Sequence, residues 1–116
     1  MCSASDVQKI IQSVAGAYRS VFGNDVVQII LYGSYARGDF TDDSDLDLAA
    51  IVVGPRRELQ QKLKQVWDIS SDLELEYGII ISPVVIPYDE YMKYKDDVPY
   101  YRNISREGVN IVDRKS

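Results

Sequence analysis

The sequence contains no histidine and a single cysteine, and both features narrow the chemistry open to the chain. Without histidine there is no imidazole for acid–base catalysis, and the usual zinc ligand sets are excluded. Cys2 has no second cysteine for an internal disulfide, which fits the reducing cytoplasm. We therefore expect a cytoplasmic protein whose chemistry rests on carboxylate, hydroxyl and backbone groups.

Long apolar runs and clustered basic residues are also missing. No run of roughly eighteen apolar residues occurs, so we expect no transmembrane helix and no membrane association. Residues 1–6 lack a basic region followed by an apolar stretch, so we expect no signal peptide. The net charge is −5 and no basic stripe is present, so we expect no nucleic acid binding.

The pattern of apolar residues and turn signals predicts an alternation of helices and strands within a single domain, residues 1–116. Ser3 or Ser5 caps the first helix. Pro83 interrupts the third strand, which predicts an edge or a bulged strand there. The predicted helices cover residues up to 22, 34–37, 55–76, 88–95 and 99–107, and the predicted strands cover residues 26–32, 46–53, 79–86 and 109–112.

This order of elements argues for an α+β fold, with helices on one face of a small mixed β-sheet and the other face open to a ligand. The long helix over 55–76 shows one apolar stripe, which we predict to be buried in the core. Its members are Leu59, Leu63, Val66, Trp67, Ser70, Leu73 and Tyr77.

The stretch over residues 31–48 carries the chemistry of the chain. A strand leads into Gly33-Ser34, and Asp45-Leu46-Asp47 opens the next strand. Side chains alternate along a strand, so Asp45 and Asp47 point the same way and form an oxygen site of the kind Mg²⁺ prefers. Gly33 permits close approach, and Ser34 begins a helical turn whose amides favour phosphate oxygens. The alternatives are a solvated strand start and a plain turn.

Arg37 and the tyrosine-rich C-terminal part can each be interpreted in two ways. Arg37 either reaches a terminal phosphate or pairs with Asp39 or Asp43. The tyrosine-rich C-terminal part either packs as half-buried short helices or forms an interface with a partner. Its tyrosines are Tyr88, Tyr91, Tyr94, Tyr100 and Tyr101.

Gly33-Ser34, followed after ten residues by Asp45-x-Asp47, resembles the signature of the DNA polymerase β-type nucleotidyltransferase superfamily. The short chain is similar to its minimal nucleotidyltransferase (MNT) branch, often paired with HEPN-domain partners. The resemblance implies the nucleotidyltransferase fold and Mg²⁺ held by catalytic Asp45 and Asp47. It also implies a nucleoside triphosphate, ATP, bound near Gly33, Ser34 and Arg37. A nucleoside monophosphate would pass to an acceptor hydroxyl, a tyrosine of a HEPN toxin, with this chain as the antitoxin.

One part of the superfamily pattern is missing from this sequence. The full catalytic set has a third carboxylate on the next core strand, where residues 79–85 offer only Ser82. Neutral serine is a poor Mg²⁺ ligand and no general base at neutral pH. Glu74 and Glu76, at the end of the preceding helix, do not fit the motif position. We predict that Ser82 lies beside the aspartate pair and faces the same side. Another residue or a partner supplies the third role, or transfer is slow or absent.

Three functions therefore remain open. The first is nucleotidyl transfer to a partner protein. The second is a catalytically weak or inactive protein that keeps the fold and neutralises a partner by binding alone, which the missing carboxylate favours. The third is a small-molecule nucleotidyltransferase of the antibiotic-resistance type, which normally has a longer chain. The acceptor, the base and the oligomeric state, including a homo-oligomer, stay open.

Overall fold

The computed structural model describes residues 3–111, and each predicted helix and strand is present within about two residues of its expected bounds. Cys2 and the last residue of the predicted strand over 109–112 lie outside the described residues. In chain order the elements are α1 (Ala4–Phe22), the 3-10 turn η1 (Gly23–Asp25), β1 (Val26–Tyr32), α2 (Ser34–Arg37), β2 (Leu46–Val52), α3 (Arg56–Tyr77), β3 (Ile81–Pro87), α4 (Tyr88–Tyr94), α5 (Pro99–Glu107) and β4 (Val109–Asn110).

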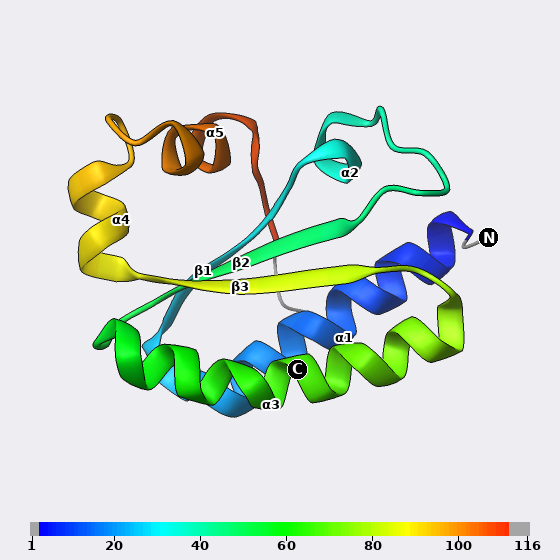
Figure 1. The fold of residues 1–116 in the computed structure, drawn as a ribbon, viewed down its shortest axis with the longest axis horizontal. Helices are drawn as coiled ribbons and strands as arrows, with labels where there is room; N and C mark the ends of the chain where they lie inside the picture. The colour runs from blue at the N-terminus through cyan, green and yellow to red at the C-terminus, as the bar shows by residue number, and fades with distance from the viewer. Residues whose placement is uncertain (1–2, 112–116) are drawn as a thin grey trace.

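The four strands form one mixed sheet in the order β3-β2-β1-β4. β1 runs antiparallel to β2 and β4, whereas β2 and β3 are parallel. Pro83 therefore lies on an edge strand, as predicted, where its missing amide costs no ladder hydrogen bond. The long helices α1 and α3 lie side by side on one face of the sheet, and α2, α4 and α5 lie on the other (Figure 1).

Each face of the sheet has its own apolar core. Leu48 and Ala50 of β2 point into the larger core beneath α1 and α3, whereas Ala49 and Ile51 point into the smaller one. Ile104 of α5 closes the smaller core and is 1% exposed. The predicted α+β class is confirmed. The prediction of helices on one face only is wrong, because α2, α4 and α5 lie on the second face and α4 and α5 bury an apolar core there (Figure 1).

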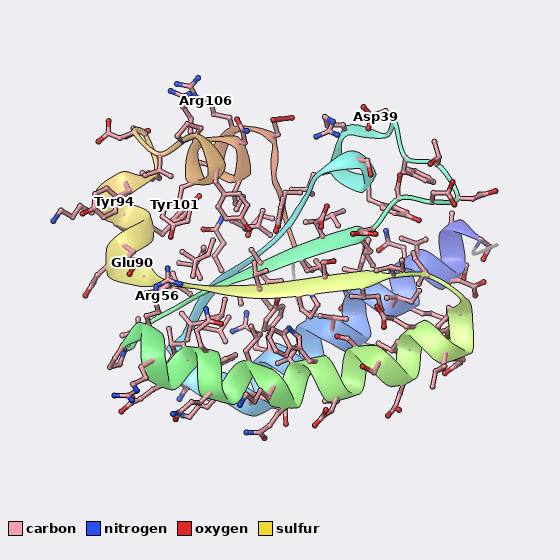
Figure 2. All side chains as sticks on the ribbon, in the orientation of Figure 1. Asp39, Arg56, Glu90, Tyr94, Tyr101 and Arg106 are labelled. Carbon is pink, nitrogen blue, oxygen red and sulfur yellow. The ribbon has the colours of Figure 1, made fainter. Side chains whose placement is uncertain are left out.

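A polar cluster fastens α4 and α5 to the start of α3 at the opposite end of the sheet from Asp39 (Figure 2). Arg56 Nε donates to Glu90 Oε1 over 3.1 Å, and the Tyr101 hydroxyl donates to Glu90 Oε2 over 3.3 Å. The hydrogen bond from Arg56 lowers the pKa of Glu90. Two tyrosines of the C-terminal part, Tyr91 and Tyr101, thus have packing roles, whereas Tyr94 and Tyr100 remain exposed.

The prediction that Trp67 belongs to the core is wrong, since its side chain is 46% exposed. Its indole Nε1–H donates to the carbonyl of Pro83 over 3.0 Å. Helical spacing identifies the buried side of α3, but the width of that side depends on what lies beneath the helix. Trp67 sits on the flank that meets the outer edge of β3. The other members of the stripe are buried (Leu59, Leu63, Val66, Ser70) or partly buried (Leu73, Tyr77).

The exposure of Trp67 gives a direct test by unfolding in urea. Trp67→Ala should lower the free energy of unfolding by about 1–2 kcal/mol, since much of the ring is already in water and one hydrogen bond is lost. Leu63→Ala is the matched control in the same helix. Leu63 is 2% exposed, so its truncation should cost about 2–5 kcal/mol. A loss of unfolding free energy for Trp67→Ala equal to or larger than that for Leu63→Ala would show that Trp67 is part of the core.

Candidate active site

The candidate site is built around the first residues of β2. Asp45 directly precedes the strand and is exposed, and Asp47, its second residue, is half-buried. Leu46 lies between them and is fully buried in the core beneath α1 and α3. Because side chains alternate along the strand, both carboxylates point to the opposite face, as predicted from the sequence.

Gly33 lies directly against Asp47. The register between β1 and β2 pairs Tyr32 with Asp47, and Gly33 follows with a φ of +77°. A Cβ atom at Gly33 would collide with the Asp47 carboxylate. Gly33 O then accepts hydrogen bonds from the amides of Ala36 and Arg37, 3.1 Å each, which start α2. The turn that begins at Gly33 and Ser34 is thereby held beside the aspartate pair.

Replacing Gly33 tests this close approach. Gly33→Ala should destabilise the protein by more than about 1 kcal/mol, because both the positive φ and the carboxylate oppose a methyl group. Gly16→Ala is the control, since Gly16 lies within α1 with open space around its Cα. That substitution should stabilise the protein by about 0.5–1 kcal/mol. Similar melting temperatures for both variants would contradict the placement of Asp47.

The Asp47 carboxylate is held in an environment that disfavours its charge. Burial raises the pKa of Asp47, the charge of Asp45 raises it further, and Arg37 lowers it in part. A bound cation would relieve this repulsion. Within residues 3–111 no group of three or more His, Cys, Asp or Glu side chains could hold a metal ion. Two carboxylates still fit Mg²⁺, which is commonly held by one or two carboxylates together with substrate phosphates and water.

The raised pKa of Asp47 predicts a pH-dependent gain in stability for Asp47→Asn. The folded state binds the Asp47 proton more tightly than the unfolded state does. Protonated Asp47 therefore does not destabilise the wild-type fold below the unfolded pKa, whereas charged Asp47 destabilises it once the pH has risen through the folded pKa. Without divalent metal, Asp47→Asn should therefore melt higher than wild type at about pH 7, and the difference should vanish near about pH 3. Asp42→Asn, in the exposed turn before β2, should show no such gain.

Arg37 is paired with carboxylates of α5 and of the loop after α2. Its Nε lies 3.3 Å from Asp39 Oδ2 and its Nη1 lies 3.6 Å from Glu107 Oε1 on α5. These carboxylates raise the pKa of Arg37, the hydrogen bond to Asp39 most. Of the two predicted ion-pair partners, Asp39 is thus confirmed, whereas Glu107 had no signal in the sequence. All three side chains are exposed, and exposed ion pairs hold an arginine only weakly, so Arg37 can exchange them for a phosphate.

A cavity of about 200 Å³ separates α2 from α5 beside Gly33. The Tyr32 and Tyr100 hydroxyls lie 2.9 Å apart at its wall. Burial and this hydrogen bond raise the pKa of Tyr32, so its hydroxyl stays protonated and able to donate. Sequence reasoning missed this wall because it depends on how α5 packs across the sheet. Its lining residues are Tyr32, Gly33, Arg37, Tyr100, Asn103, Ile104 and Glu107.

Ser82 lies on the other side of the aspartate pair. In the parallel register of β2 and β3 it pairs with Asp47, so both side chains point to the same face and the predicted position of Ser82 is confirmed. Glu74 Oε2 instead accepts a hydrogen bond from the Ile81 amide over 2.8 Å. No third carboxylate therefore joins Asp45 and Asp47 within the described part of the chain.

Comparison with known proteins decides the family. The sequence model of one protein family, described as the nucleotidyltransferase domain, matches residues 11–108. The chain belongs to the nucleotidyltransferase domain family. The MJ0604 protein of Methanocaldococcus jannaschii, whose given name is that of a protein adenylyltransferase, is 34% identical to this nucleotidyltransferase-domain chain over 101 residues, covering 87% of this chain and 93% of its own.

Solved structures show the same fold at low sequence identity. A nucleotidyltransferase-named protein from Sulfolobus solfataricus superposes with a TM-score of 0.55 at 18% identity, covering 97% of this chain and 91% of that one. A toxin–antitoxin structure with AMP-PNP gives a TM-score of 0.50 at 14% identity, covering 94% and 72%. The predicted family resemblance and fold class are thus confirmed. None of the helices within residues 3–111 has the length and apolar content to cross a membrane.

Proposed function

We propose that this nucleotidyltransferase-domain protein transfers the adenylyl group of ATP to a hydroxyl of a partner protein, a tyrosine of a HEPN toxin, and so acts as its antitoxin. The observation that carries the proposal is the aspartate pair facing the same side of the sheet with Gly33 packed directly against Asp47. The family match supports nucleotidyl transfer. The name of the MJ0604 relative supports a protein acceptor, and the toxin–antitoxin fold neighbour with AMP-PNP supports the antitoxin role.

Each side chain of the site has a proposed role. Asp45 and Asp47 hold Mg²⁺, the turn at Gly33 and Ser34 holds phosphate oxygens, and Arg37 leaves its carboxylate partners for the terminal phosphates. When bound, the metal neutralises charge on the phosphates and activates the α-phosphate toward attack. The protein itself contributes positioning and electrostatic preorganisation, which are the main components of catalysis in such transfers.

A second candidate function is neutralisation of a partner by contact alone. Ser82 favours it, because the neutral hydroxyl next to Asp47 supplies no third carboxylate. In that case the chain would bind nucleotide but transfer nothing.

The aspartate pair provides the test of the metal and nucleotide assignment. Asp45→Asn with Asp47→Asn removes two charges at nearly unchanged shape, so calorimetric titration with Mg-ATP should lose its binding signal. The matched control, Asp42→Asn with Asp43→Asn, removes the same charge from the adjacent turn and should keep affinity within about twofold of wild type. Unchanged affinity in the site variant would refute the metal assignment.

The acceptor is tested by transfer of label. ATP labelled at the α-phosphate, Mg²⁺ and the product of a neighbouring HEPN gene should give a labelled toxin, whereas label at the γ-phosphate should not be transferred. Nucleotide binding without any transferred label would favour neutralisation by contact alone.

A further inference from the structure

A cavity of about 360 Å³ lies between α3 and the outer edge of β3. Ser82 belongs to its lining and also pairs with Asp47 across the sheet. The cavity therefore lies along β3, the strand next to the aspartate pair, on the side away from Gly33 and α2, and neither aspartate is part of its lining. Besides Ser82, the groups used below are Trp67, Ser70 and Glu74, all on the same side of α3.

The direction of the transfer reaction gives this side of the site a role. In transfer from a triphosphate the attacking and leaving oxygens lie roughly in line on opposite sides of the phosphorus. With the phosphate tail at Gly33 and Arg37, an incoming hydroxyl approaches from the β3 side. Its proton needs an acceptor, and the chain has no histidine. Asp45 and Asp47 are assigned to the metal, and Ser82 is neutral.

Glu74 is the carboxylate in this cavity, and the fold fixes its position. Its Oε2 accepts a hydrogen bond from the Ile81 amide over 2.8 Å. In the register of β2 and β3, Ile81 pairs with Leu46, the residue between the two aspartates. The carboxylate thus lies at the outer edge of β3, level with the aspartate pair along the strands. It reaches that edge from α3, which packs on the face of the sheet opposite to Asp45 and Asp47. Glu74 is half-buried, and its second oxygen, Oε1, keeps lone pairs for another donor.

Two other groups show that the cavity is suited to an aromatic alcohol. The Oγ of Ser70, a residue only 3% exposed, has no hydrogen-bond partner within residues 3–111. A buried hydroxyl without a partner is costly and rare, so an incoming polar group would satisfy it. Trp67, held by its hydrogen bond to Pro83, gives an aromatic wall against which a phenol ring can pack.

We propose that the β3 cavity receives the acceptor side chain and that Glu74 is the catalytic proton acceptor. This inference rests on the proposed transfer function. The acceptor oxygen forms a bond to the α-phosphorus, and the bond from that phosphorus to the bridging oxygen of the β-phosphate breaks. Pyrophosphate leaves with the electron pair. The hydroxyl proton moves to Glu74 Oε1 and then to water. Glu74 acts on the acceptor and not as a metal ligand.

Glu74→Gln tests the proposal, with Glu76→Gln as the matched control two residues further along α3. The glutamine oxygen can still accept the Ile81 amide, so the fold and the affinity for Mg-ATP should stay within about twofold of wild type. The rate of α-label transfer to the partner should fall by about 10²-fold or more, as loss of a general base does. Glu76→Gln should transfer at the wild-type rate.

A rescue separates catalysis from a structural role. Ser82→Asp in the Glu74→Gln background places a carboxylate on the same cavity and should recover part of the rate. Wild-type transfer by Glu74→Gln, or loss of its Mg-ATP binding together with its stability, would overturn the proposal. If the wild-type chain binds Mg-ATP but labels no partner, the transfer function fails and Glu74 has no catalytic role. If wild type transfers and only the Asp45→Asn, Asp47→Asn variant fails, the function stands and Glu74 is excluded.

Discussion

The central position of β2 is the constraint on which the rest of the site depends. Antiparallel pairing with β1 brings Gly33 against Asp47, and parallel pairing with β3 brings Ser82 to its other side. The register of β2 leaves no intermediate choice, because a slip of one residue moves every side chain to the other face of the sheet. Asp47 would then point into the core and Leu48 toward water. The complete burial of Leu46 and Leu48 therefore holds the carboxylates in place as firmly as any direct contact with them.

The site is held together at a cost to the folded state. Asp47 carries charge in a partly desolvated position beside a like charge, and Gly33 adopts a backbone conformation that other residues resist. Such local strain persists where the surrounding structure over-determines it. Here the surroundings are two apolar cores, one on each face of the sheet. In the function proposed above, a bound cation would offset the repulsion between the two aspartates.

Much of this structure could be predicted from residues that act locally, and the rest could not. Alternation of side chains over Asp45-Leu46-Asp47 predicted the face of both aspartates, and Pro83 predicted an edge or a bulged strand, of which the edge is found. Pairings between distant elements had no local signal: Glu107 meets Arg37 because α5 packs beside α2, and α4 and α5 cover part of a face expected to be open. The prediction that Trp67 is buried was wrong for a related reason. Periodicity gives the direction of a helix face, but it does not show how far the sheet beneath that face extends.

The outer edge of β3 has a consequence for how this protein meets other chains. Along that edge the Ile81 amide donates a hydrogen bond to Glu74, and the Pro83 carbonyl accepts one from Trp67. Pro83 and Pro87 have no amide hydrogen to donate. A foreign strand aligned there would find few backbone groups to pair with, which is how natural sheets avoid joining edge to edge. This edge of the sheet is thereby protected from pairing with a strand of another chain. Recognition at this side must work through side chains, which discriminate between partners where backbone pairing does not.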